Sequence, residues 1–167
     1  LATLKEELLN PQINPTGKLV VFTESTDTAN YLTEKVEAFL NTKVLNVSSD
    51  NRSKIFETIQ ENFDANYIGE KKNDYNIIIT TDVLAEGVNL HRSNVIVNYD
   101  TPWNATRLMQ RIGRVNRIGS VAGVIYNYNF YPSQQGDEEI KLYSNALIKL
   151  QGFHTAFGED AQIYTHE

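Results

Sequence analysis

The sequence IIIT at residues 77–80 is a run of β-branched residues, and it points to the fold class of the whole chain. Apolar residues without polar alternation are typical of a strand that is buried on both faces, as in a parallel sheet. Four further strands are predicted at residues 18–22, 44–47, 95–98 and 121–131.

Amphipathic helices alternate with these strands. Apolar residues at helical spacing predict helices at about residues 26–40, 52–63, 104–116 and 137–151, with Ser25 or Thr26 as the cap of the first. Such alternation predicts βαβ units, so we expect an α/β fold of three α-β-α layers around a mainly parallel open sheet. Ligands of such sheets bind in the loops beyond the carboxyl ends of the strands.

The chain divides into three parts. Residues 1–16 read as a short amphipathic helix and a linker with two Asn-Pro pairs, residues 17–152 as the folded domain, and residues 153–167 as a tail. Because the sequence begins with Leu1, we expect it to be a fragment of a longer protein.

Composition excludes several classes of protein. The 167 residues carry a net charge of −6 and include no cysteine, so disulfides, thiolate nucleophiles and cysteine-based zinc sites are excluded. No apolar run approaches the roughly 20 residues that span a bilayer. We therefore expect no membrane association and a cytoplasmic location.

Positive charge is concentrated in one window. Residues 101–136 contain no Asp or Glu but hold four of the six arginines, so this window carries +4 within a background of −10. A solvated helix face is the ordinary interpretation of a charge run. An all-arginine cluster without acidic partners one helical turn away favours anion binding instead.

A helix over this window places Arg107, Arg111 and Arg114 on one face, next to an apolar face that can pack on the sheet. Gly113 lies in the middle of this helix at a cost of about 1 kcal/mol relative to Ala. Close backbone packing is the predicted reason for this glycine.

The familiar catalytic motifs are incomplete. Gly17-Lys18 is followed by Leu19 rather than Ser or Thr, and Gln12 stands where a P-loop has its first glycine. No Gly-x-Gly-x-x-Gly follows a predicted strand, and the three histidines have no metal-ligand spacing. The acidic residues 137–139 read as a helix start. We expect no metal site and no complete catalytic site within this sequence.

Three segments in order resemble motifs of superfamily 2 helicases and translocases. QRIGRVNR at residues 110–117 resembles motif VI, IIITTDVLAEGVNL at 77–90 resembles motif V, and KLVVFTES at 18–25 resembles motif IV. The run at 95–120 is especially similar to bacterial Swi/Snf-like ATPases.

The resemblance implies the second, C-terminal RecA-like domain of an ATP-driven nucleic-acid motor. An N-terminal RecA-like domain of the same chain would then supply the P-loop and the Mg²⁺ ligands, with ATP bound between the two domains. This fragment alone is expected to be inactive.

The resemblance also assigns roles to single residues. Arg117 would be the arginine finger, and Arg114 would join it at the γ-phosphate of ATP. Gln110 would organise the cleft, and Gly87 and Asn89 would lie near the nucleotide, with Asn89 approaching the ribose.

Nucleic acid would be contacted at two further positions. Thr81 and Ser25 would hold phosphates of the strand through sequence-independent contacts. DEAD-box enzymes usually have Arg where Glu86 stands and Asp where Asn89 stands, which favours the Swi/Snf-like branch and DNA, with RNA left open. Ser120, where that branch commonly has Gln, leaves the subfamily undecided.

Several alternatives remain open at this stage. Thr23, Asp82 and Asp100 could join the site, but Asp82 could instead cap a short helix and Asp100 could orient Arg111. Trp103 could stack on a base, although a packing role is more typical. The rival to a motor domain is a flavodoxin-like binding module whose arginine face meets an acidic protein.

Overall fold

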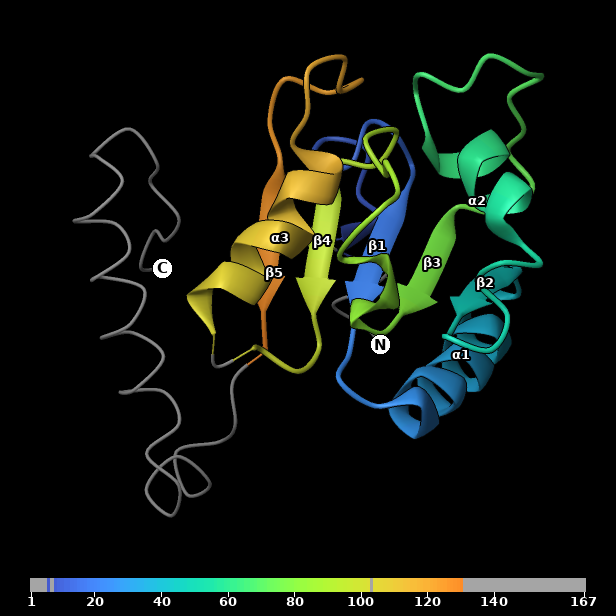
Figure 1. Cartoon of the computed structure of the whole chain (residues 1–167), viewed down its shortest axis with the longest axis vertical. Helices are drawn as coiled ribbons and strands as arrows, with labels where there is room; N and C mark the ends of the chain where they lie inside the picture. The colour runs from blue at the N-terminus through green and yellow to red at the C-terminus, as the bar shows by residue number, and fades with distance from the viewer. Residues whose placement is uncertain (1–5, 7, 103, 131–167) are drawn as a thin grey trace.

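The computed structural model describes residues 6, 8–102 and 104–130. Five strands form one sheet in the order β2-β3-β1-β4-β5, and every neighbouring pair is parallel (Figure 1). The strands are β1 (Leu19–Phe22), β2 (Val44–Val47), β3 (Ile77–Thr80), β4 (Val95–Asn98) and β5 (Tyr126–Asn129). The parallel sheet predicted from residues 77–80 is confirmed, with β5 beginning later than residue 121.

The helices within the described residues are α1 (Thr26–Leu40), α2 (Phe56–Phe63), the 3-10 helix η2 (Asp82–Leu84) and α3 (Ala105–Val115). None of them is long and apolar enough to span a membrane. The helix predicted at residues 137–151 and the tail at 153–167 lie outside the described residues, as does most of the segment predicted to form an N-terminal helix.

Two helix starts differ from expectation. Ser25 occupies the N-cap position of α1, but its side chain makes no capping hydrogen bond. Helix α2 begins at Phe56 rather than near residue 52, and residues 51–54 form turns instead. The Asn51 side chain binds the backbone at the start of these turns. Its Oδ1 accepts the Ser48 N–H at 2.9 Å and its Nδ2 donates to the Asn46 carbonyl at 2.9 Å. Such local bonds compete with helix formation.

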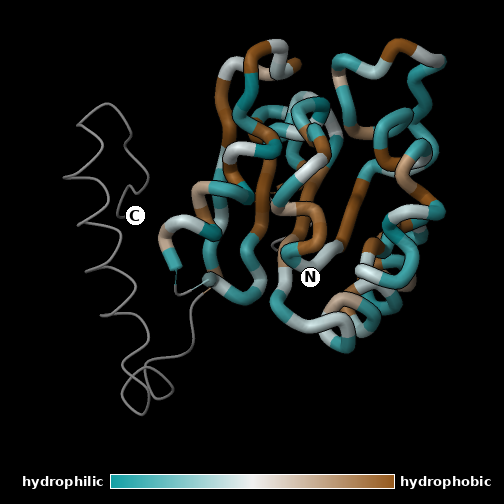
Figure 2. The backbone as a smooth tube through the Cα atoms, in the orientation of Figure 1, coloured by the Kyte–Doolittle hydropathy of each residue, from teal (hydrophilic) through white to brown (hydrophobic). Residues whose placement is uncertain are grey.

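Alternate residues along the strands divide between two cores, which gives the three layers. One face of the sheet packs with Ile59 and Phe63 of α2 and Val115 of α3, and the other packs with Ala29 and Val36 of α1. Figure 2 shows hydrophobic residues concentrated on the central strands, which are buried along their whole length. The expected α-β-α architecture is therefore confirmed.

The strand register brings the carboxyl ends of the central strands into line. Phe22 at the end of β1 is paired with Thr80 of β3 and with Asn98 of β4. The segments that follow these strands, at residues 23–25, 81–90 and 99–104, consequently leave the sheet from one edge. This edge is where a ligand site is expected in an open parallel sheet.

Candidate functional site

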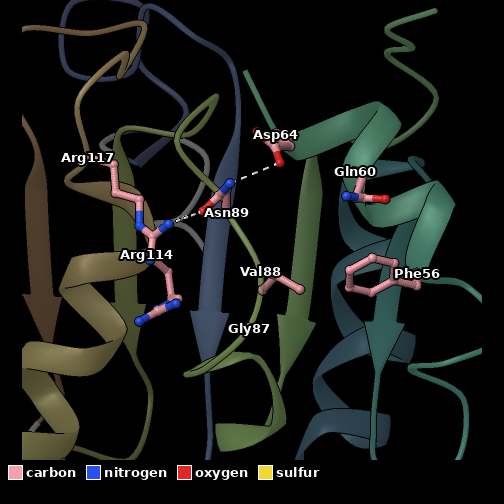
Figure 3. Close-up of a pocket in the computed structure, with 8 residues that line it drawn as sticks. All are labelled: Phe56, Gln60, Asp64, Gly87, Val88, Asn89, Arg114 and Arg117. Carbon is pink, nitrogen blue, oxygen red and sulfur yellow. Dashed lines mark hydrogen bonds between the residues drawn. The ribbon is translucent and has the colours of Figure 1, made fainter. Parts of the chain in front are cut away.

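A pocket of about 290 Å³ lies between α2, the end of α3 and the segment at residues 87–89 (Figure 3). The lining residues are Phe56, Gln60, Asp64, Gly87, Val88, Asn89, Arg114 and Arg117. Four of the predicted nucleotide-site residues are thus brought together, although they lie up to 30 positions apart in the sequence.

The guanidinium of Arg117 points toward Asn89 across the pocket (Figure 3). Arg117 lies just beyond the end of α3, and its Nη1 donates a hydrogen bond to Asn89 Oδ1. Its Nε donates to the Gly113 carbonyl at 3.2 Å. Neutral acceptors therefore hold this cation in place.

Arg114 is the second cation of the pocket. Its Nε donates to the Gln110 carbonyl at 3.4 Å, and its own carbonyl accepts the Leu90 N–H at 2.9 Å. Burial lowers the pKa of Arg114, the nearby charge of Arg117 lowers it further, and Glu86 opposes the shift. Within the described residues neither arginine forms an ion pair, so the donors of both guanidinium groups are free of a direct carboxylate partner, and the two arginines outnumber the one acidic residue of the lining, Asp64. This arrangement suits an anion.

Gly87 meets a steric requirement at the edge of this pocket. Its φ is +76°, and an added Cβ would lie 2.7 Å from Arg52 Nη2, which donates to the Glu86 carbonyl at 2.9 Å. Both the left-handed backbone and the close guanidinium exclude a larger residue without rearrangement.

Gln110 was predicted to organise the cleft, and it lies outside the pocket lining. Its Nε2 donates to Glu86 Oε1 at 3.1 Å, which connects α3 to the segment that carries Gly87. Thr81 and Ser25 lie apart from the pocket at the carboxyl edge, at the N-cap positions of η2 and α1. They follow the paired strands β3 and β1, so the structure brings both to the same edge of the sheet.

The expectation of a row of unpaired arginines on α3 is wrong for Arg107 and Arg111, which both pair with Asp82. Arg111 is fully buried, and its Nε donates to Asp82 Oδ1 at 2.7 Å. Its Nη1 donates to Asn98 Oδ1 at 3.0 Å and to the Asp100 carbonyl at 3.1 Å. The guanidinium carbon lies 5.1 Å from the centre of the Phe22 ring. Burial of Arg111 also removes it from the arginine face that a protein-binding module would need.

The roles left open for the acidic residues are now defined. Asp82 makes no side-chain cap on η2 and instead pairs with Arg111 and, at 3.5 Å, with Arg107. Asp100 meets Arg111 through its carbonyl, while its carboxylate accepts hydrogen bonds from Thr23 Oγ1 and, at 3.1 Å, from the Glu24 N–H. These groups form a structural network, and Trp103 lies outside the described residues.

The packing explanation for Gly113 is also wrong. A Cβ built on this residue would meet no atom within 4 Å apart from its own helix backbone and its chain neighbours. The glycine therefore leaves open space beside the arginine-bearing end of α3.

Sequence reasoning missed Asp64, Phe56 and Gln60, which line the pocket from α2 and its C-cap. Asp64 is buried, and its Oδ2 accepts a hydrogen bond from Asn89 Nδ2 at 3.1 Å. No spacing signal marks this residue because it contacts Asn89 from 25 positions away along the chain.

Comparison with known proteins identifies the family of this chain. Residues 1–119 match the family model of the helicase conserved C-terminal domain. The chain is 50% identical over 89 residues to the uncharacterized ATP-dependent helicase YqhH of Bacillus subtilis, covering 53% of this chain and 15% of the relative. It is 31% identical over 139 residues to the ATP-dependent RNA helicase SUB2 of Eremothecium gossypii, covering 82% of this chain and 29% of the relative.

Two solved structures share the fold. The C-terminal part of the Fun30 ATPase domain has a TM-score of 0.61 at 19% identity, covering 84% of this chain and 42% of that chain. The yeast DEAD-box splicing factor Prp28 has a TM-score of 0.61 at 22% identity, covering 86% and 29%. The chain thus spans less than half the length of each of these proteins.

Proposed function

Because the chain belongs to the family of helicase conserved C-terminal domains, we propose that it forms the C-terminal half of an ATP-hydrolysing nucleic-acid motor. The observation that carries this proposal is the pocket in which Arg114 and Arg117 converge with Gly87 and Asn89. An N-terminal RecA-like domain of the same native chain would supply the P-loop and the Mg²⁺ ligands. ATP would bind between the two domains.

The pocket suits the phosphate end of a nucleotide. It has two guanidinium groups without carboxylate partners among the described residues, and a glycine where a side chain would collide with Arg52. Arg117 is our choice for the arginine finger, with Arg114 beside it. A pre-positioned guanidinium stabilises the charge that develops on phosphoryl oxygens in the transition state.

The other nucleotide contacts follow from the same pocket. Gly87 would allow the backbone to approach the nucleotide, and Asn89 would lie on its ribose side. Gln110 would keep the segment of Gly87 against α3 through Glu86.

Nucleic acid would run along the carboxyl edge of the sheet. Thr81 and Ser25 leave neighbouring strands there, and their hydroxyl and backbone groups suit contacts with phosphates rather than bases. We propose a DNA translocase of the Swi/Snf-like branch, because Glu86 and Asn89 depart from the usual DEAD-box residues. A bacterial cytoplasm would be its location, in keeping with the Bacillus relative.

The choice of nucleic acid is tested by ATPase stimulation. The native chain that contains this domain would be assayed with duplex DNA, single-stranded DNA and RNA at equal nucleotide concentration. Duplex DNA should stimulate most. Stronger stimulation by RNA would overturn the DNA assignment and favour the activity named in relatives such as SUB2.

The finger is tested in the same native chain by Arg117→Ala. Loss of the charge should lower kcat for ATP by about 10³-fold. Arg107→Ala on helix α3 is the matched control, since that side chain is 56% exposed and is not among the residues that line the pocket. An unchanged ATPase rate in Arg117→Ala would reject the finger, and ATP turnover by a pure preparation of these 167 residues would reject the shared site.

A further inference from the structure

A series of side-chain contacts extends from the Arg117 guanidinium to Asn89, Asp64 and His91. Arg117 donates to Asn89 Oδ1, Asn89 Nδ2 donates to Asp64 Oδ2 at 3.1 Å, and His91 Nδ1 lies 3.6 Å from Asp64 Oδ1 (Figure 3 shows the first two contacts). We propose that Asp64 is a positioning residue for Arg117 and acts through the Asn89 carboxamide. This inference rests on the proposed function of Arg117 at the ATP phosphates.

The hydrogen-bonding chemistry of Arg117 and Asp64 fixes the orientation of the Asn89 carboxamide between them. A guanidinium has only donors, and an ionised carboxylate has only acceptors. The Asn89 carboxamide has one end of each kind, so it satisfies both neighbours in only one of its two orientations. Asp64 therefore directs the amide oxygen toward Arg117.

The hydrogen-bond relay from Asp64 through Asn89 to Arg117 holds the guanidinium in place without neutralising its charge. Within the described residues no carboxylate oxygen lies within 4.0 Å of its guanidinium, because Asn89 stands between Arg117 and Asp64. A direct ion pair would compete with a phosphate for the same donors. Asn89 orients the cation and leaves its charge available.

Asp64 itself is fixed by its surroundings. It forms the C-cap of α2, where its N–H donates to the Gln60 carbonyl at 3.0 Å, and its Oδ1 accepts the Asn66 N–H at 2.8 Å. His91 is buried, and neither ring nitrogen has a hydrogen-bond partner. His91 lies beside Oδ1, so the second carboxylate oxygen, Oδ2, is left to Asn89.

The test uses Asp64→Asn, which keeps the size of the side chain but can present either a donor or an acceptor to Asn89. In ¹⁵N NMR of this chain, the Arg117 Nε–Hε group should become mobile, seen as a fall in its heteronuclear NOE. Asn89→Ala, which breaks the relay at its centre, should do the same. In the native ATPase chain, Asp64→Asn should lower kcat by about 10- to 100-fold and change KM for ATP by less than about threefold, because misplacement affects the reacting geometry.

Rescue separates positioning from general structural damage. The exchanged pair Asp64→Asn with Asn89→Asp restores one donor and one acceptor in the right order, since the new carboxylate accepts from Arg117 and from the new amide. It should restore the immobility of Arg117. An Arg117 signal that stays rigid in both single variants would overturn the inference, as would failure of the exchange to restore rigidity. If Arg117 loosens but Arg117→Ala leaves the ATPase unchanged, the positioning holds and the proposed function fails.

Discussion

Helix α3 and the turn after it carry arginines in two opposite environments. Arg111, in the middle of the helix, is fully buried against Asp82, while Arg114 in its last turn and Arg117 just beyond it border a pocket and form no ion pair among the described residues. Asp82, the acidic partner that distinguishes Arg111 from Arg114 and Arg117, lies 29 positions before Arg111 in the sequence. An arginine run is therefore divided into buried and pocket-lining members by acidic residues outside it.

The largest expected effect on stability comes from Arg111. Arg111→Ala should lower the free energy of unfolding by about 3–5 kcal/mol, because it leaves a buried cavity and the Asp82 carboxylate without its buried partner. Arg117→Ala should change it by less than about 0.5 kcal/mol, since that side chain is exposed. Urea denaturation of both variants measures the difference. Equal losses of stability would contradict the division between the buried Arg111 and the pocket-lining Arg117.

Removing the acidic partner tests the same pair from the other side. Asp82→Asn should lower the free energy of unfolding by about 2 kcal/mol, because the ion pair becomes a hydrogen bond to an uncharged amide and the buried guanidinium loses its compensating charge. Glu86→Gln is the matched control, and its effect should stay within about 0.5 kcal/mol. Thermal unfolding of the two variants provides the comparison. Similar losses would mean that burial of the arginine does not depend on Asp82.

A gain is expected at Gly113. Gly113→Ala should raise the free energy of unfolding by about 1 kcal/mol, since the site is helical and an added Cβ meets nothing within 4 Å. Gly87→Ala should lower it, because of the positive φ and the close Arg52 guanidinium. Denaturant midpoints of both variants would settle the signs. A loss at Gly113 would mean that the space beside it is filled in solution.

The smallest expected effect concerns pH at the pocket end. Burial lowers the pKa of His91 below the usual 6.5, Asp64 opposes this, and Arg117 and Lys71 add to it. The His91 side chain therefore binds a proton near pH 6.5 in the unfolded chain but only at lower pH in the folded chain. As pH falls below 6.5, the free energy of unfolding should decrease. His91→Gln should reduce this slope in denaturation curves between pH 7 and 5, and an identical slope would assign the effect to other groups.

Much of the fold follows from local sequence. Strands β2, β3 and β4 have the predicted bounds because each is a short, mainly apolar run in which at least half of the residues are β-branched. The start of α2 differs from the prediction, since residues 51–54 form turns in which the Asn51 side chain binds the backbone of Asn46 and Ser48. Apolar periodicity does not report such a bond.

The site was predictable where motifs exist and not elsewhere. Gly87, Asn89, Arg114 and Arg117, which the motif resemblance singles out, line one pocket, and their roles at a nucleotide stay a prediction. The burial of Arg111 and the presence of Asp64 depend on contacts made across the fold between distant positions, so no local pattern could reveal them.

Several contacts connect the segment at residues 82–90 to α3 and the turn after it. Asp82 binds Arg111, Glu86 binds Gln110, Asn89 binds Arg117, and the Leu90 N–H binds the Arg114 carbonyl.

These links occur at intervals of a few residues, so the segment has little freedom to stretch independently of the helix. A pull on Thr81, which directly precedes the first of these contacts, would therefore also displace α3. The carboxyl edge of the sheet and the pocket would then move together.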